Sequence, residues 1–190
     1  MTITFTTGLM GSGKSRNLIR TYKKDRTKKT CFAAHLTNNT GRIGLVESRN
    51  GESIYAINLN KDKEDLTEKF LELYISLTKV ETIYIDESQF LSSSTIESII
   101  RLSKEHNFDV HFYGLLTTFT DDLFESSEYL LKKIDQGDII QLMQFCKMEN
   151  CGQVAYHNAR IVNDRVCREG KTFVEEKSTY LPLCSKHYFE

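Results

Sequence analysis

The stretch that decides the fold is Ile3 to Ser15, ITFTTGLMGSGKS. It opens with alternating β-type residues, Ile3 to Thr7, and continues with the octet Gly8 to Ser15. The octet matches G-x-x-x-x-G-K-[ST], a pattern in which glycines let successive backbone N–H groups point into one concavity. A helix that begins there adds the partial positive charge of its N-terminus, which favours phosphate oxygens. The stretch therefore predicts a strand, a phosphate-binding loop and a helix.

Two side chains at the end of the octet supply further chemistry. Lys14 can reach the β- and γ-phosphates of a nucleotide, and the Ser15 hydroxyl can join the oxygen shell of Mg²⁺. The alternative is a chance glycine-rich turn. The strand before the octet and the helix-like run with Leu18 and Ile19 after it favour the nucleotide site. The predicted phosphate-binding residues of the loop are Gly8, Met10, Gly11, Ser12, Gly13, Lys14 and Ser15.

Composition bounds the class of protein. The chain has 190 residues and a formal net charge of −1, so we expect one domain, with or without a small appendage, and no general attraction to nucleic acid or membranes. The sequence has no run of about 18 apolar residues, the length that a helix needs to span a bilayer. A strand that starts within two residues of the N-terminus leaves no room for a signal peptide. We expect a cytoplasmic protein with reduced thiols, whose five cysteines are no disulfide framework.

Strand-like and helix-like stretches alternate along the chain. The pattern predicts strands at 30–36, 53–59, 80–85 and 110–115, and helices at 14–24, at 63–79 and after the cap residues Ser92 to Ser94. This order predicts an α/β fold, a P-loop (RecA-like) mostly parallel sheet flanked by helices, with its ligand at the carboxyl ends of the strands. The predicted core face of the helix at 63–79 is Leu66, Phe70, Leu73 and Leu77.

Residues 37–52 are polar and rich in glycine, which predicts a mobile loop. Arg42 and Arg49 lie within it. Arginines in such loops usually face solvent, but in a phosphate-handling enzyme they are candidates for charge stabilisation.

Two acids follow the strand predicted at 80–85. Asp86 at the carboxyl end of a buried strand is placed to hold Mg²⁺ through water, opposite Ser15. Glu87, the adjacent carboxylate, can take a proton from an attacking hydroxyl. The alternative is a surface turn after a strand, and the phosphate-binding loop in the same chain argues against it. We therefore predict Asp86 as a phosphate-site residue and Glu87 as the catalytic base.

From Ile139 onward the sequence contains four of the five cysteines, together with His187. The pairs Cys146-x4-Cys151 and Cys184-x2-His187 offer three sulfurs and one imidazole, a tetrahedral Zn²⁺ set in zinc-ribbon order. The alternative is four unrelated residues. Because all four ligands come from the protein, we expect a structural zinc. Cys167 has no partner at ligand spacing. The predicted division is 1–139 for the nucleotide-binding domain and 140–190 for a small zinc-binding domain.

Four motifs in order resemble the type II thymidine kinase family: the P-loop with Met10, DESQF at Asp86 to Phe90, YGLLTTF at Tyr113 to Phe119, and the cysteine pairs with a terminal Cys-x-x-His. The resemblance covers essentially the whole chain. It implies a P-loop kinase domain and a zinc-ribbon domain with a loop, called the lasso, that closes over the nucleoside. It implies transfer of the γ-phosphate of ATP to the 5′-hydroxyl of thymidine or deoxyuridine, a homotetramer, and dTTP as a feedback inhibitor.

The resemblance also implies roles for single residues. Lys14, Ser15 and Asp86 match the phosphate and Mg²⁺ residues, and Glu87 matches the general base. Arg42 resembles the arginine of the family's flexible loop, and Ser48 to Gly51 resembles the SRxG that follows it. The nucleoside-binding residues implied are Met10, Leu115, Phe119, Phe124, Asn158, Phe173, Val174 and the lasso residue Tyr180. We expect the lasso, from about Ala159 to Tyr180, to be mobile because it is polar.

Three features of the sequence depart from the family pattern. An acid and a base expected after Gly114-Leu115 are Thr118 and Thr120, an acid expected before Arg42 is Thr40, and the first cysteine pair is loosely spaced. The threonines could remove an ion pair that holds a loop. They motivate an alternative function, a regulatory nucleotide-binding protein that has lost catalysis. A zinc-ribbon nucleic-acid-binding ATPase is a third hypothesis, which the lack of a basic stripe in 140–190 disfavours.

Overall fold

Strand β1 (Ile3–Gly8) lies inside the main sheet of the protein. It pairs in parallel with a strand on each side, one at residues 109–114 and one at residues 139–142. The computed structural model describes residues 1–36, 44–59, 64–170 and 179–190, apart from the side chains at 35, 36, 64–68 and 70. Within these ranges the main sheet has the order β5-β2-β6-β7-β1-β8, and every neighbouring pair is parallel. Its other strands are β2 (Cys31–Leu36), β5 (Ile57–Leu59), β6 (Thr82–Asp86), β7 (Asp109–Gly114) and β8 (Ile139–Leu142).

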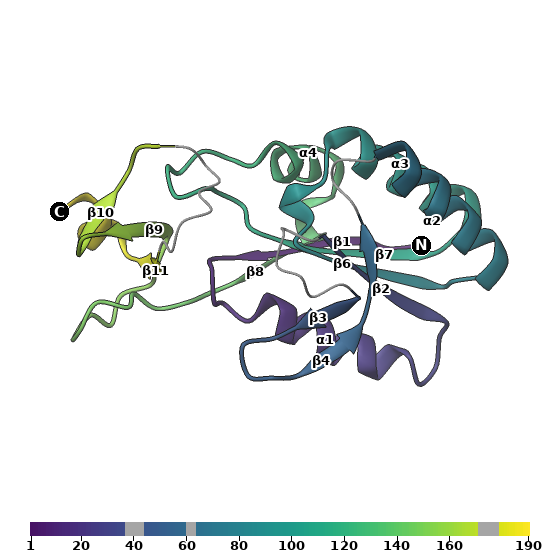
Figure 1. The fold of residues 1–190 in the computed structure, drawn as a ribbon, viewed down its shortest axis with the longest axis horizontal. Helices are drawn as coiled ribbons and strands as arrows, with labels where there is room; N and C mark the ends of the chain where they lie inside the picture. Colours follow the sequence, from purple (N-terminus) through teal and green to yellow (C-terminus); the bar gives the residue numbers. More distant parts are fainter. Residues whose placement is uncertain (37–43, 60–63, 171–178) are drawn as a thin grey trace.

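Helices cover both faces of this sheet (Figure 1). One face carries α2 (Glu64–Thr78), α3 (Ser93–His106) and α4 (Glu125–Lys133), and the other carries α1 (Lys14–Asp25). Two apolar clusters correspond to the two faces. The first includes Phe5, Ile83, Ile85, Ile96, Ile99, Leu102, Phe108 and Phe112. The second includes Leu18, Ile19, Tyr22, Val46, Ile54, Tyr84 and Tyr113. The α/β class predicted from the alternating pattern is confirmed.

The predicted core face of α2 is wrong where the structure describes it. Leu73 and Leu77 are 61% and 74% exposed, whereas Leu71 and Ile75 are 2% and 4% exposed and belong to the core. The helix carries apolar residues on two faces, and packing against the sheet selects the other one. The side chains of Leu66 and Phe70 lie outside the described ones.

The segment after β2 differs in part from the predicted loop. Residues 37–43 lie outside the described ranges. From Leu45 the chain forms a hairpin in which β3 (Leu45–Glu47) pairs antiparallel with β4 (Ser53–Tyr55). The stretch predicted as one strand at 53–59 is divided at Ala56, whose N–H donates to the Gly44 carbonyl. The hairpin therefore leaves the main sheet and carries the Ser48 to Gly51 turn beside α1 (Figure 1).

A second, smaller module lies at the end of the molecule opposite the α2–α3 end (Figure 1). Its described strands, in the order β10-β9-β11, are antiparallel: β9 (His157–Val162), β10 (Arg165–Cys167) and β11 (Thr179–Leu183), followed by α5 (Ser185–Phe189). Ala159 to Cys167, predicted as part of a mobile lasso, thus forms a hairpin. Residues 171–178 lie outside the described ranges. The predicted division at 139/140 falls within β8, which pairs with β1.

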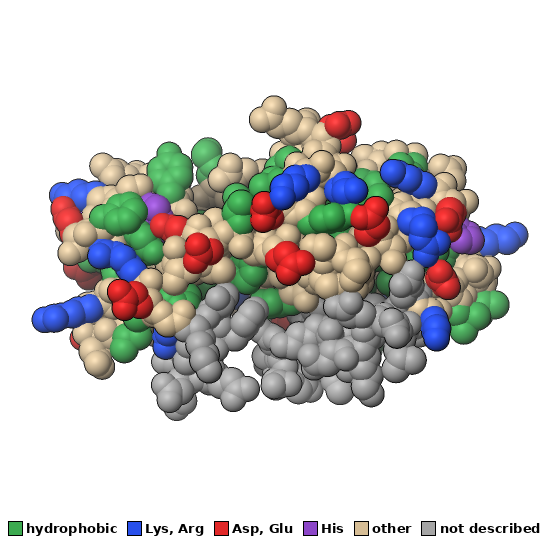
Figure 2. Space-filling model, turned by 90° about the horizontal axis from the view of Figure 1, so that it is seen from above, with side chains coloured by type: hydrophobic (Ala, Val, Ile, Leu, Met, Phe, Trp, Pro, Cys, Tyr) green, Lys and Arg blue, Asp and Glu red, His purple; other side chains and the backbone are tan. Residues whose placement is uncertain are grey.

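Acidic and basic side chains are interspersed over the face seen in Figure 2, without one large field of a single sign. No described helix is both long enough and apolar enough to cross a membrane.

Candidate active site and metal cluster

The loop between β1 and α1 curls around an open cavity of about 390 Å³. Gly11 has φ +81° and Gly13 has φ +89°, left-handed values that L side chains rarely adopt. The Ser12 N–H donates to the Leu9 carbonyl at 3.1 Å, which closes the turn. Met10, Gly11, Gly13, Lys14 and Ser15 line the cavity. The loop therefore has the backbone shape that a chain of phosphates needs.

Lys14 is held inside this loop and is 9% exposed. Its ammonium group donates to the carbonyls of Gly8 at 2.9 Å and Leu9 at 3.0 Å. Burial lowers the pKa of Lys14, and the carboxylates of Glu87 and Asp86 oppose that effect. An anion in the cavity would stabilise the charged form of Lys14 further.

Asp86 ends β6 at the floor of the site and is 3% exposed. Burial, with the neighbouring Glu87 carboxylate as the next cause, raises the pKa of Asp86 to about 7, while the Ser15 hydroxyl donates a hydrogen bond that lowers it. The structure thus brings Asp86 and Ser15 together as the sequence predicted. A hydroxyl beside a desolvated carboxylate is an oxygen donor set that fits a hard cation such as Mg²⁺.

Glu87 follows in a strained backbone conformation, with φ 56° and ψ 36°. A non-glycine residue in this region costs free energy, and such residues concentrate at functional sites. This conformation follows directly on the end of β6, and Glu87 lines the cavity together with Lys14 and Leu115. The carboxylate predicted as the base therefore faces the phosphate-binding loop.

Gln89 is a site residue that the sequence reasoning missed. It is 4% exposed, its Nε2 donates to the Glu87 carboxylate at 2.5 Å, and its Oε1 accepts from the Leu115 N–H at 3.0 Å. One side-chain amide thus fixes both the base and the start of the segment that follows β7. The signal available in the sequence was a polar side chain two residues after the predicted base Glu87, between Ser88 and Phe90.

Two serines at the start of α4 hold the backbone of Gln89 and Leu115 in place. The Ser126 hydroxyl donates to the Gln89 carbonyl at 2.8 Å, and the Ser127 hydroxyl donates to the Leu115 carbonyl at 2.6 Å. A Cβ at Gly114 would lie 2.6 Å from the Ser88 Oγ and 2.9 Å from the Gln89 Oε1. Glycine is therefore required at 114 for this close approach.

The hairpin tip places Arg49 over the loop. Arg49 lines the same cavity, and a Cβ at Gly11 would lie 2.9 Å from the Arg49 Nη1. The tip is held by the Ser48 hydroxyl, which donates to Asn50 and to the Glu52 carbonyl. Arg49 thus adds a cation to the rim of the phosphate-binding cavity, which Lys14 and Arg16 also line. Arg42 lies outside the described residues.

The residues predicted to contact the nucleoside do not all line one cavity. Met10 and Leu115 line the phosphate-binding cavity, and Asn158 lines a second cavity of about 180 Å³. The Phe119 ring lies 6.4 Å from that of Tyr180, and the Phe124 ring lies 6.1 Å from that of Phe90. Phe173 and Val174 lie outside the described residues.

Asn158 connects three segments. It is 3% exposed, its Oδ1 accepts from the Met10 N–H at 2.8 Å, and its Nδ2 donates to the Thr117 carbonyl at 3.2 Å. The amide therefore ties β9 both to the phosphate-binding loop and to the segment after β7.

Hydrogen bonds from Thr118 and Thr120 hold their loop, at the positions where the family pattern has an acid and a base. The Thr120 hydroxyl donates to Asp122 at 2.7 Å, so the Thr118 hydroxyl, 2.8 Å away, donates to Thr120. The Thr120 N–H in turn donates to the Thr118 Oγ1. A chain of neutral hydroxyls thus replaces the acid and base expected from the family pattern. Thr40 lies outside the described residues.

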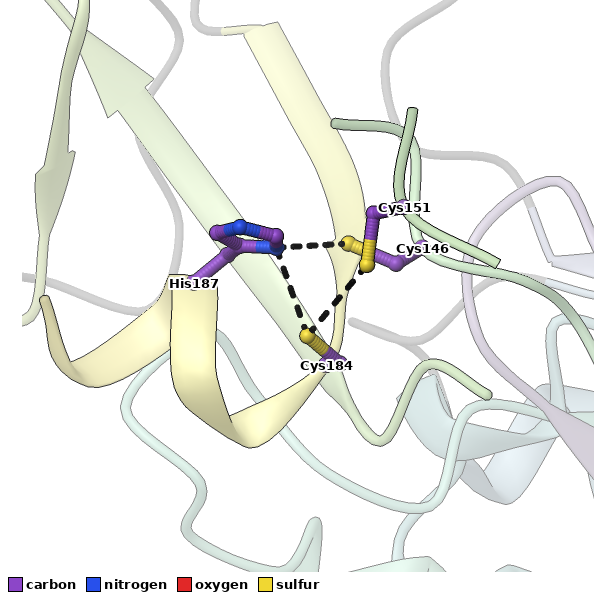
Figure 3. A group of neighbouring side chains, drawn as sticks. All are labelled: Cys146, Cys151, Cys184 and His187. Atoms are coloured by element: carbon purple, nitrogen blue, oxygen red, sulfur yellow. Dashed lines mark hydrogen bonds between the residues drawn. The ribbon is translucent and has the colours of Figure 1, made fainter. Parts of the chain in front are cut away.

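The four predicted metal ligands converge in the small module (Figure 3). Their ligand atoms all lie within 4.8 Å of one another. Cys146 Sγ and Cys184 Sγ each lie 3.4 Å from His187 Nδ1, and Cys151 Sγ lies 3.9 Å from Cys184 Sγ. Tetrahedral zinc, with Zn–S of about 2.3 Å and Zn–N of about 2.0 Å, separates two sulfurs by about 3.8 Å and a sulfur from a nitrogen by about 3.5 Å. The cluster therefore fits zinc.

The surroundings of Cys146 favour a metal ligand. Burial alone would raise the pKa of its thiol, but the amides of Cys184 and Met148 and the side chains of His187 and Cys151 bring that pKa to about 6. The thiolate is the form that binds metal. All five cysteines fall in the described ranges, and all are free of disulfides.

The fold and the site define a P-loop nucleotide-binding protein of the α/β class with a separate Cys₃His cluster that could hold a metal such as zinc. The family model described as thymidine kinase matches residues 1–188. A thymidine kinase of Bacillus subtilis subsp. natto is 48% identical over 189 residues, which cover 100% of this chain and 97% of the relative. The chain belongs to the thymidine kinase family.

More distant relatives agree with this assignment. A thymidine kinase of Streptococcus pyogenes serotype M3 is 30% identical over 190 residues, covering 96% of this chain and 94% of the relative. A thymidine kinase of Legionella pneumophila (strain Lens) is 30% identical over 185 residues, covering 94% of this chain and 85% of the relative.

The purified protein is expected to contain about one zinc per chain. Cys151→Ser should lower the zinc content and increase amide exchange in β9 and β11. Strand β1 and helix α1 should keep their protection, because their apolar side chains belong to clusters separate from that of the small module. Metal analysis and hydrogen exchange measure both effects. Cys167→Ser is the matched control, since the Cys167 thiol donates to the Glu169 carbonyl outside the cluster. Equal zinc loss in both variants, or zinc-free protein after purification without chelator, would contradict the ligand set.

Proposed function

We propose that this protein is a thymidine kinase, which transfers the γ-phosphoryl group of ATP to the 5′-hydroxyl of thymidine, and of deoxyuridine, in nucleotide salvage. The observation that carries the proposal is a single cavity lined by Lys14, Ser15 and Glu87. It joins a phosphate-binding loop to a carboxylate that can accept a proton. Membership of the thymidine kinase family supports the nucleoside as acceptor.

Each residue of the proposed site has a separate role in the reaction. The loop from Gly8 to Ser15 binds the phosphates of ATP, and Lys14 stabilises charge on the β- and γ-oxygens. Ser15 and Asp86 would hold Mg²⁺, which would neutralise phosphate charge. Glu87 accepts the proton of the 5′-hydroxyl as the new P–O bond forms and the bond to the leaving ADP breaks. Gln89 keeps the Glu87 carboxylate aimed at the cavity.

The nucleoside would lie between the P-loop domain and the small module. We assign Met10, Leu115, Phe119, Phe124 and Tyr180 to its apolar contacts, with Phe173 and Val174 on the lasso. Asn158 would shape the site near the base, since both ends of its amide already bind backbone groups. Arg49, on the rim, would stabilise phosphate charge.

The remaining assignments follow from the resemblance and from features of the surface. We propose a homotetramer, and the exposed apolar residues Ile140, Met143 and Phe145 on and after edge strand β8 are available for assembly. The free cysteines are compatible with the cytoplasm. The Cys₃His cluster would hold a structural Zn²⁺, and dTTP would inhibit by occupying the active site. We place the domain boundary after Leu142, because β8 belongs to the main sheet.

A nucleoside panel with γ-labelled ATP tests the function. Thymidine and deoxyuridine should become labelled monophosphates, whereas purine deoxynucleosides should not, because membership of the thymidine kinase family favours a pyrimidine acceptor. Chromatography of the products gives the readout. Nucleotide binding without thymidine-dependent product would instead favour a regulatory protein.

Glu87→Gln should retain the fold and the affinity for ADP but lower kcat about 10²- to 10⁴-fold, since the amide cannot accept the proton. Steady-state kinetics and calorimetric titration with ADP separate the two effects. Glu105→Gln is a suitable control, because this exposed acid pairs with Arg101 on α3. Turnover close to that of the wild type in Glu87→Gln would rule out Glu87 as the base.

A further inference from the structure

The residue that follows the last ligand of the metal cluster reaches the predicted nucleoside site. Tyr188 is 2% exposed, and its hydroxyl donates to the Phe119 carbonyl at 2.6 Å. Tyr188 itself is fixed from both sides: its N–H donates to the Cys184 carbonyl at 3.0 Å, and its carbonyl accepts from Arg168 Nε at 2.9 Å. A short covalent path therefore connects His187 to a hydrogen bond on the backbone of Phe119.

A second contact joins the same two segments. The His157 ring stacks on Tyr188, with centroids 4.3 Å apart and planes 6° from parallel. The His157 Nδ1 lies 2.8 and 2.9 Å from the two carboxylate oxygens of Asp121, and its Nε2 lies 3.0 Å from the Ser185 Oγ. His157 thus links Ser185, at the start of α5, to Asp121, which lies two residues after Phe119.

The order Asp121, His157, Ser185 has the geometry of a hydrolytic triad, but its surroundings favour a structural link. The imidazole lies face to face with a buried tyrosine, and Ser185 lines neither of the two cavities described above. The contacts of these residues run between the two modules, not toward a ligand cavity.

The ring of Phe119 is also bounded by the small module. The Arg160 guanidinium lies 5.5 Å from the Phe119 ring centroid, and the Tyr180 ring lies 6.4 Å away. Phe119 is 3% exposed. Backbone bonds from Thr118 N–H to Asp122 O, and from Phe124 N–H to Leu116 O, close the loop at its base. The small module therefore sets the direction of the loop tip that carries Phe119.

We propose that Tyr188 is a positioning residue for the nucleoside, through which the metal cluster sets the place of Phe119 and so the affinity for thymidine. The Tyr188 hydroxyl binds the Phe119 carbonyl and not the phosphate-binding loop, so nucleotide affinity does not depend on this hydroxyl. The proposal rests on the proposed function, in which Phe119 lines the nucleoside site. Of the four ligands, Cys184 and His187 lie at and within α5, so a bound metal fixes the helix that carries Tyr188. Lys14, Asp86 and Glu87 are held by other elements, β1, α1 and β6.

Tyr188→Phe removes only the hydroxyl and leaves the ring stacked on His157. Loss of a buried hydrogen bond corresponds to about a five- to thirtyfold change in an equilibrium. We expect the KM and the calorimetric Kd for thymidine to rise by that factor, whereas the Kd for ADP, the KM for ATP and the zinc content stay within twofold. Tyr55→Phe, at a residue that is 84% exposed on β4, should change none of these values.

His157→Phe is the second variant, in case Tyr188→Phe does not fold. It keeps an aromatic ring against Tyr188 and loses the bonds to Asp121 and Ser185, and it should weaken thymidine binding in the same selective way. Unchanged thymidine affinity in the folded variants, or equal loss of thymidine and ADP affinity, would overturn the proposal. Failure of the wild-type protein to phosphorylate thymidine would instead overturn the proposed function.

Removal of zinc with a chelator gives an independent readout. The metal-free wild-type protein should lose thymidine affinity about as much as Tyr188→Phe and retain its affinity for ADP. Chelation of Tyr188→Phe should then weaken thymidine binding further by less than twofold, because the hydrogen bond that transmits the effect is already missing. Additive losses would show that the metal acts through another route and contradict the role of Tyr188.

Discussion

The burial of opposite charges at one edge of the main sheet is the constraint on which the rest of the site depends. Lys14 and Asp86 are 9% and 3% exposed, at the ends of a loop and a strand that both point to this edge. Charged groups removed from water are costly unless they are compensated. Lys14 binds two backbone carbonyls, and Asp86 accepts from Ser15. The nucleotide phosphates and Mg²⁺ would complete this compensation, which is how a desolvated site gains affinity for them.

Support for this edge comes from two directions. On the side of α4, the Gln89 amide joins Glu87 to Leu115. The hydroxyls of Ser126 and Ser127, at the start of α4, donate to the backbone carbonyls of Gln89 and Leu115. Beside it, Asn158 on β9 joins the phosphate-binding loop to the segment after β7. The small module is therefore part of the architecture of the active site and not an appendage, and its metal cluster can act on nucleoside binding at a distance.

The chemistry that the sequence predicted is local in the chain. The phosphate-binding loop, Asp86 with Glu87, and the two ligand pairs are contiguous or closely spaced, so their geometry follows from short-range backbone preferences. The missed features are long-range. The choice of Leu71 and Ile75 over Leu73 and Leu77 depends on which face of α2 meets the sheet. The contact of Gln89 with Leu115 spans 26 residues, and that of His157 with Asp121 spans 36. No periodicity indicates such contacts.

Titration of Mg·ATP into the wild-type protein and into Lys14→Ala tests the central claim most directly. The control is Lys28→Ala, an exposed lysine beyond the end of α1. A charge-assisted contact is worth about 1.5–3 kcal/mol, so Lys14→Ala should bind Mg·ATP about 10- to 150-fold more weakly while the control is unchanged. Equal affinity in the wild-type protein and in a folded Lys14→Ala would show that the nucleotide does not bind at this loop.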